Sequence, residues 1–300
     1  MFSESPDPRQ WPHVANGVTY RRAVRELAAF FACEPTEAAV YEHRMQTDFS
    51  AYASALLRAT NTEILCVDDG YPPPGEGTSW QELGELAGCG ARPVLRIERV
   101  AESGVEIVRD EVSAARENGF VALKTISAYR TGLEFERIHD FVVAALEANE
   151  QTRAPLPVQI HCGFGDSDLH LQRADPAHLK PLIERFRETP FVLLHCYPFV
   201  REAGWLAHVY GNVYFDLSLT IPHVSRPAEA VREALELAPV SKLLYASDAA
   251  RTPELYYLAA TWWREVLAAV LPELLEDDAK RAARRILREN ARELYALSIS

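Results

Sequence analysis

The sequence predicts an α/β fold of the (β/α)8 TIM-barrel type, lacking the first strand of the barrel and carrying an N-terminal helical segment. Beyond residue 60, short Val/Ile/Leu runs alternate with amphipathic helical patterns at intervals of roughly 30 residues, the size of one βα unit. The runs are apolar on both faces, which is typical of a parallel sheet covered by helices. Two runs end on a histidine and a third leads to an aspartate, and barrel enzymes carry their reactive groups at such strand ends.

Composition limits the classes of protein to which the chain can belong. A 300-residue chain with 48% hydrophobic residues can bury one large core. No low-complexity linker divides it, so we predict one domain, with a helical segment over residues 1–60 and barrel strands 2–8 plus a C-terminal helix over residues 61–300. The net charge of -12 argues against nucleic-acid binding.

The chain shows no signal of secretion or membrane insertion. The segment 1–10 is polar and Pro-rich, and no apolar run reaches 18 residues. The five cysteines are odd in number and lack Cys-x-x-Cys spacing, which indicates reduced thiols and a cytoplasmic location. We expect a small molecule as substrate and no nucleic-acid or membrane partner, and a homo-oligomer stays open.

The first 60 residues carry helical patterns. Apolar residues recur at helical spacing over Tyr20–Cys33, Thr36–Gln46 and Phe49–Ala59. From there the pattern changes to seven short apolar runs that we predict to be strands: Glu63–Val67, Pro93–Ile97, Phe120–Ile126, Pro157–Ile160, Phe191–Leu194, Asn212–Leu217 and Leu243–Ala246.

Local signals delimit the helices between the strands. The segment Ser103–Glu106 has the pattern of a capping box, and Gly119 ends the helix that it opens. Asp175 and Thr252 each precede a proline, which places a capping side chain before a favourable first helical residue. The chain ends in a predicted long helix, Ala279–Leu297.

A closed barrel needs eight strands, and the sequence supplies seven. Either the eighth strand is hidden near Trp11–Thr19, or the chain begins after it. An open doubly wound sheet also fits the alternation, but no Gly-x-Gly-x-x-Gly follows an early strand.

His161, His195 and Asp248 are the primary candidates for a site. Each lies at the end of an apolar run, and barrel strand ends converge. Neutral imidazole together with a carboxylate suits zinc or a similar divalent ion. Core packing for the histidines and turn capping for Asp248 are the simpler interpretations.

Five further residues could line the mouth of the barrel. Lys124 interrupts an apolar run, and a buried lysine needs an ion pair, a substrate group or a modification. Arg130 and Arg201 follow strands and could hold a substrate carboxylate, as could Arg96, although solvated or ion-paired roles are equally compatible. His223 could line the pocket.

Several motifs resemble the amidohydrolase superfamily of metal-dependent barrel hydrolases, most of all the branch that also occurs fused to glutamine-synthetase-like domains. The carrying stretches are Leu123–Leu133, Ile160–Leu169, His195–Leu206, Asn212–Leu217, Ser241–Asp248 and Asn290–Tyr295.

The resemblance implies roles for individual residues. His161 would bind the metal, His195 would bind a second metal or contact substrate, and Asp248 would be a ligand and proton shuttle. Lys124 matches a position that in some members is a carboxylated, metal-bridging lysine. The chain lacks the family's first-strand His-x-His pair, and this gap coincides with the missing strand.

The expected function is hydrolysis of a C–N or C–O bond by water activated on a divalent ion, zinc before manganese or iron. Asp248 would take the proton, and His195 would polarise the substrate. A metal-dependent non-oxidative decarboxylase is the second hypothesis, and it would give Arg130 or Arg201 a role. An inactive barrel with a binding or regulatory role is the third, because the His-x-His ligands are absent.

Overall fold

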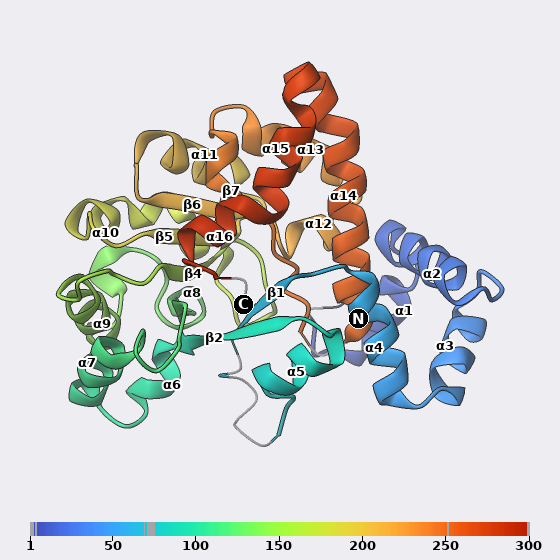
Figure 1. The fold of residues 1–300 in the computed structure, drawn as a ribbon, viewed down its shortest axis with the longest axis horizontal. Coiled ribbons are helices and arrows are strands. Elements are labelled where there is room, and N and C mark those ends of the chain that lie inside the picture. The colour runs from blue at the N-terminus through green and yellow to red at the C-terminus, as the bar shows by residue number, and fades with distance from the viewer. Residues whose placement is uncertain (1–2, 4, 69, 71–75, 251, 299–300) are drawn as a thin grey trace.

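The computed structural model describes residues 3, 5–68, 70, 76–250 and 252–298. They form a seven-stranded, all-parallel sheet in which every strand pairs with the next one in the chain. The sheet curls into a half-barrel with helices on its outer side (Figure 1), so the predicted fold class is confirmed. The strands are β1 (Ile64–Val67), β2 (Gly90–Arg96), β3 (Ala122–Thr125), β4 (Val158–Cys162), β5 (Phe191–His195), β6 (Val213–Asp216) and β7 (Leu243–Leu244).

The central strands are buried on both faces, as their uninterrupted apolar sequences predict. Every residue of β3 and of β5 is buried. Leu123 and Leu193 belong to the large core between sheet and helices, whereas Ala122 and Val192 belong to a smaller cluster inside the half-barrel. This alternation places the next residue of the inner face of β3, Lys124, inside the half-barrel as well.

The two outer strands lack a second strand partner among the described residues. All four residues of β1 are only partly buried, and β7 has just two residues. The alternative of a hidden strand near Trp11–Thr19 is wrong, because this segment is helical, with α1 (Trp11–Val14) followed by the start of α2 (Val18–Phe31). The part of the chain that the structure describes therefore contains no eighth strand.

The N-terminal helical segment is confirmed: α2 is followed by α3 (Glu37–Gln46) and α4 (Phe49–Ala59). Thr36 and Asp48 cap α3 and α4 by accepting hydrogen bonds from backbone N–H groups three residues on. These helices lie beside α14 (Pro253–Leu275), on the side of the molecule away from the helices that follow β2 and β3 (Figure 1). The buried Glu254 carboxylate joins them to α14 by accepting hydrogen bonds from Tyr52 and Arg44.

The helices that cover the half-barrel follow the predicted alternation. They are α5 (Trp80–Ala87), α6 (Ile97–Ala101), α7 (Val105–Ala114), α8 (Ser127–Arg130), α9 (Asp140–Glu150), α10 (Lys180–Arg185), α11 (Val200–Val209), α12 (Thr220–His223), α13 (Pro227–Leu235), α15 (Ala279–Arg284) and α16 (Asn290–Leu294).

Local capping was predicted correctly at one of three places. Asp175 accepts a hydrogen bond from the N–H of Ala177 at 2.8 Å, as expected. Ser103 does not cap α7, because Gly104, with φ 114°, occupies the N-cap position. Thr252 precedes α14, but its side chain makes no capping hydrogen bond.

The C-terminal helix is not uniform. A π-helical turn, Arg285–Glu289, separates α15 from α16, which ends at Leu294 instead of the predicted Leu297. Tyr295 follows directly and is buried in the cluster inside the half-barrel, where its hydroxyl accepts a hydrogen bond from Gln159 on β4. The end of the chain thus contributes to the interior of the half-barrel.

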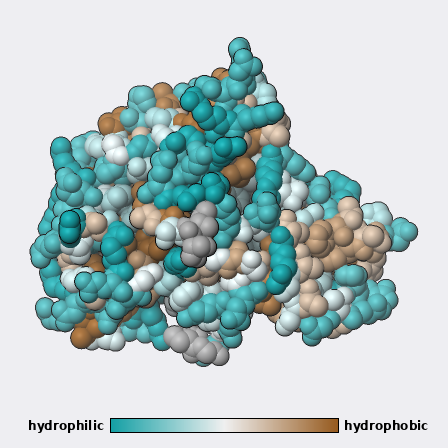
Figure 2. All heavy atoms as spheres, viewed as in Figure 1, coloured by the Kyte–Doolittle hydropathy of each residue, from teal (hydrophilic) through white to brown (hydrophobic). Residues whose placement is uncertain are grey.

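Exposed apolar side chains gather on the N-terminal helices. Figure 2 shows brown surface over the region of α2 and α3. The large apolar residues that are more than half exposed in this part of the chain are Trp11, Val18, Tyr41, Met45 and Phe49. The described residues bury none of these side chains, and a homo-oligomer stays a prediction.

Candidate functional site

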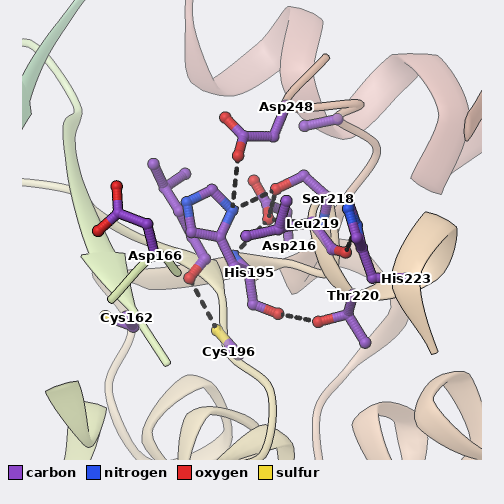
Figure 3. A network of polar contacts seen from close by, with 12 residues as sticks. Cys162, Asp166, His195, Cys196, Asp216, Ser218, Leu219, Thr220, His223 and Asp248 are labelled. Atoms are coloured by element: carbon purple, nitrogen blue, oxygen red, sulfur yellow. Dashed lines mark hydrogen bonds and ion pairs between the residues drawn. The ribbon is translucent and has the colours of Figure 1, made fainter. Parts of the chain in front are cut away.

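His195, the last residue of β5, is held by its backbone. Its φ is 68°, in the left-handed region, and Cys196 has φ 66°. The N–H of His195 donates to Oδ1 of Asp216 at 2.8 Å, and its carbonyl accepts from Oγ1 of Thr220 at 2.6 Å (Figure 3). Two contacts from the next strand and its following helix therefore fix where the imidazole points.

The hydrogen bonds of Ser218 assign the tautomer of His195. The Ser218 hydroxyl donates to Oδ1 of Asp216 at 2.7 Å, and a hydroxyl has only one proton to donate. Nδ1 of His195 lies 2.7 Å from Oγ of Ser218, whose proton is already used, so Nδ1 carries a proton and donates it to Oγ of Ser218 (Figure 3). Nε2 of His195 is left with a lone pair, which suits it to bind a cation or to accept a hydrogen bond.

His161 on β4 lies against His195. The two ring centroids are 4.6 Å apart, and the ring of Tyr129 lies 4.6 Å from His161 as well. Burial lowers the pKa of both histidines well below the usual value, and the charge of Lys124 lowers both further. Both imidazoles are therefore neutral at physiological pH. Nε2 of His161 is buried without a hydrogen-bond partner among the described residues.

Asp248 follows β7 with φ 46°. Its Oδ2 lies 3.7 Å from Nδ1 of His195 (Figure 3), and 36% of its side-chain surface remains exposed. Partial desolvation by the surrounding walls of the cleft raises the pKa of this carboxyl group, while the nearby positive charge of Lys124 acts in the opposite direction. A carboxylate with a raised pKa is a better proton acceptor than an ordinary aspartate.

A cleft of about 1070 Å³ opens at this end of the half-barrel. It runs between the two outer strands and along α16. The charged and polar side chains of the site that line it are Asp68, Arg96, Lys124, His195, Asp216, Ser218 and Asp248. The sequence-predicted residues His195, Asp248 and Lys124 therefore share one cleft.

The other three substrate-binding candidates do not line this cleft, although His223 is close enough to His195 and Asp248 for its charge to lower the pKa of both. Arg130, at the end of α8, is exposed. The side chain of Arg201 on α11 is 70% exposed and pairs with Glu233 on α13. His223 lies beside a separate pocket of about 580 Å³, together with Phe164 and Tyr197. Of the arginines considered, Arg96 is the one that lines the cleft, so a substrate contact by Arg130 or Arg201 would need a different surface.

Sequence analysis gave no role to Asp216 and Ser218, the pair that holds His195. A signal was present, because Asp216 interrupts the apolar run Asn212–Leu217 near its end, as the site residues do in theirs. The sequence analysis also did not predict the ion pair between Arg96 and Asp68. That contact joins the ends of two neighbouring strands, and it forms only once the strands are paired.

The donors present are suited to a divalent ion. His161 has a buried neutral nitrogen without a partner among the described residues, and His195 presents its Nε2 lone pair. Within the described residues, however, no three His, Cys, Asp or Glu side chains already lie close enough to enclose an ion. His161 and His195 therefore supply nitrogen donors for a metal, and the described residues do not complete a ligand set around them.

We expect replacement of Asp216 by asparagine to change how stability depends on pH. Burial raises the pKa of Asp216 from 3.8 to about 6, against three hydrogen bonds that favour its ionised form. The folded state thus loses stability as pH rises from about 4 to about 6, since ionisation is easier in the unfolded chain. Asparagine keeps an acceptor oxygen and does not ionise, so the free energy of unfolding of the variant relative to wild type should rise by about 3 kcal/mol across this window.

Urea denaturation at a series of pH values measures this difference. A difference between D216N and wild type that stays constant from pH 4 to pH 7 would contradict the raised pKa of Asp216.

No helix among the described residues has the length and apolar character to cross a membrane.

The half-barrel of parallel strands, with imidazoles and carboxylates at the carboxyl ends of its strands, defines a TIM-barrel-like α/β protein. A family model described as amidohydrolase matches residues 90–297. The chain belongs to the amidohydrolase family, which confirms the resemblance of its motifs.

One curated protein is similar to about half of the chain. The chain is 41% identical over 162 residues to Protein fluG of Emericella nidulans, a match that covers 51% of this chain and 19% of the fungal protein. The chain thus matches about a fifth of the length of that curated relative.

Two solved structures share the fold. A Lactobacillus casei protein provisionally named a metal-dependent hydrolase superposes with a TM-score of 0.85 at 27% identity, covering 98% of this chain and 88% of that one. An uncharacterised TIM-barrel protein of Bordetella bronchiseptica has a TM-score of 0.55 at 14% identity, covering 95% and 90%, and shows the fold alone.

Proposed function

We propose that this chain carries the active site of a metal-dependent hydrolase that cleaves a C–N or C–O bond in a small polar molecule. The observation that supports this most directly is the position of His195, whose neutral imidazole lies against that of His161 and near the Asp248 carboxylate, in a cleft that His195 and Asp248 line. The family supplies the general chemistry, and the fold by itself does not determine the reaction.

Each residue of the site has a separate role in the proposed reaction. A divalent ion, zinc as the first choice for such donors, would polarise the scissile group and lower the pKa of a water molecule. His161 would hold it through Nε2. Asp248 would accept the proton of the attacking water and pass it to the leaving group.

The role of His195 follows from its tautomer. Because Nδ1–H is used by Ser218, Nε2 can bind the ion or accept a hydrogen bond from water or substrate. The expected polarisation of a substrate carbonyl would require a proton on Nε2 instead. We therefore assign His195 to orienting the nucleophile or the ion, with Asp216 as its positioning residue.

Metal binding tests this function. Protein stripped with a chelator should regain zinc on dialysis, and it should then hydrolyse members of a panel of small amides, esters and lactones. His161→Ala should lose most of the bound metal and the activity. His170→Ala is the matched control, because His170 is an exposed histidine that follows the same strand.

Equal metal content and activity in His161→Ala and His170→Ala would refute the proposal. A wild-type protein that binds no metal and hydrolyses no member of the panel would favour the inactive barrel with a binding role.

Non-oxidative decarboxylation is the second candidate, and the cationic side chains Arg96 and Lys124 in the cleft favour it. A carboxylated substrate would be held by these cations next to the same site. Product analysis separates the two reactions, because a decarboxylase releases CO2 and a hydrolase releases an acid together with an amine or alcohol.

A further inference from the structure

We infer that the cleft contains a subsite for a carboxylate group of the substrate, formed by the ammonium group of Lys124 with the guanidinium of Arg96 beside it. This inference rests on the proposed function and adds the class of substrate, a small molecule that carries a carboxylate near the bond that reacts.

The register of the sheet places the two cations next to each other. Arg96 on β2 pairs with Lys124 on β3, and both side chains line the cleft. Neighbouring strands are about 4.8 Å apart, and like charges directly opposite each other on one face destabilise a sheet. The electrostatic repulsion between two neighbouring cations is smaller where an anion lies between or above them.

Arg96 is already neutralised. Its Nε donates to Oδ2 of Asp68 at 2.8 Å, and its Nη2 donates to the same oxygen. Nη1 makes no hydrogen bond to a described residue. Arg96 can thus keep its pair with Asp68 and still donate one hydrogen bond into the cleft.

Lys124 is not neutralised by a close partner. The residue is 8% exposed, and among the described residues its ammonium group makes no hydrogen bond and no ion pair within 4 Å. A buried ammonium group without a partner is costly, so the site favours a bound anion. The ammonium also acts on the reactive groups, because its charge lowers the pKa of His161, His195 and Asp248.

The charge balance selects the kind of anion. Asp68 pairs with Arg96, so Lys124 is the cation of this pair that has no close carboxylate. The carboxylates of Asp216 and Asp248 in the same cleft disfavour a ligand with more than one negative charge. A carboxylate carries one negative charge and two acceptor oxygens, which match an ammonium group and one guanidinium N–H. A phosphate group carries up to two negative charges and would leave one unbalanced.

Bound in this way, a substrate would be anchored beside the reactive groups. The carboxylate would lie at Lys124, and the scissile bond would extend toward Asp248 and His195, which line the same cleft. Binding through a part of the substrate that does not react would orient the part that does.

Ligand-observed NMR on the metal-free protein tests the subsite without catalysis. The probes are propionate, its neutral isostere propionamide, and inorganic phosphate. Wild type should bind propionate at least ten-fold more tightly than propionamide and more tightly than phosphate. Lys124→Gln should abolish the preference for propionate and leave propionamide unchanged, whereas Lys180→Gln, at an exposed lysine, should retain it.

Any of the following results would contradict the proposed carboxylate subsite. Equal binding of propionate and propionamide by wild type removes it, and this comparison does not depend on the folding of any variant. Phosphate binding as tightly as propionate contradicts the charge balance. An intact mass increased by one CO2 at Lys124 shows that the side chain is a carbamate and not a cation. Since these measurements need neither metal nor turnover, they can fail while the metal and activity tests of the hydrolase succeed.

Discussion

Replacing Asp248 by asparagine should lower the rate of hydrolysis by about 10²–10⁴-fold, the usual contribution of a general base. Asparagine retains the size of the side chain but cannot accept the proton of the attacking water. The carboxylate also lies 3.7 Å from Nδ1 of His195, so the substitution removes a negative charge beside the neutral imidazole. Steady-state kinetics on an active member of the substrate panel measure the effect, which should fall on kcat more than on KM.

The pH dependence of the same reaction identifies the base. The pKa of Asp248 is raised by partial desolvation in the cleft, and the base must be ionised to act. Activity of the wild type should therefore fall as pH drops through a pKa above the ordinary aspartate value of 3.8. The residual activity of D248N should lack this acid limb. Asp277→Asn, at an exposed acid, is the control and should match wild type at every pH. A D248N variant that retains full activity would eliminate Asp248 as the base.

Replacing Gly163 by alanine should destabilise the protein by about 3 kcal/mol or more, as the sum of backbone strain and overpacking. Gly163 follows β4 two residues after His161 and has φ 79°, which side chains with a Cβ rarely adopt. An added Cβ would lie 2.3 Å from the carbonyl oxygen of Tyr197 and 2.9 Å from the carbonyl carbon of Cys196. Both are backbone atoms, so they cannot move aside as the end of a flexible side chain could. The Tyr197 carbonyl also accepts a hydrogen bond from the N–H of Phe164, which the displacement would strain.

Chemical denaturation of the metal-free protein measures the loss. Gly211→Ala is the control, because an added Cβ there meets no atom within 4 Å and the backbone is not in the left-handed region. This control should leave stability unchanged or raise it by up to about 1 kcal/mol. If Gly163→Ala is as stable as Gly211→Ala, the turn after β4 is not as closely packed as described.

The strands and the N-terminal helices were predictable because their patterns are local. Each of the seven apolar runs became a strand, and Phe49–Ala59 is a helix with the predicted bounds. Capping was less predictable, since the side chain of Thr252 fits the pattern yet makes no capping bond. Cap geometry depends on the direction from which the chain enters the helix, and three or four residues do not determine that direction.

Some residues of the site were predictable from local sequence patterns, and others were not. His161, His195 and Asp248 were identified because each ends or follows an apolar run, which is visible in the sequence. Asp216 and Ser218 were not identified, although they hold His195 and assign its proton. Their role depends on φ 68° at His195 and on the register of β5 against β6, and both are set by the assembled sheet.

By itself, the sequence determined the order and type of the elements, the family, and the strand ends that carry reactive side chains, because these follow from periodicity and from motifs of neighbouring residues. Only the tertiary structure decided which charges meet. It paired Arg96 with Asp68, left Lys124 without a close partner among the described residues, and placed Arg130 and Arg201 outside the cleft. The physical reason is that the electrostatics of a side chain depend on groups brought close by the curl and register of the sheet, and these groups lie tens of residues away along the chain.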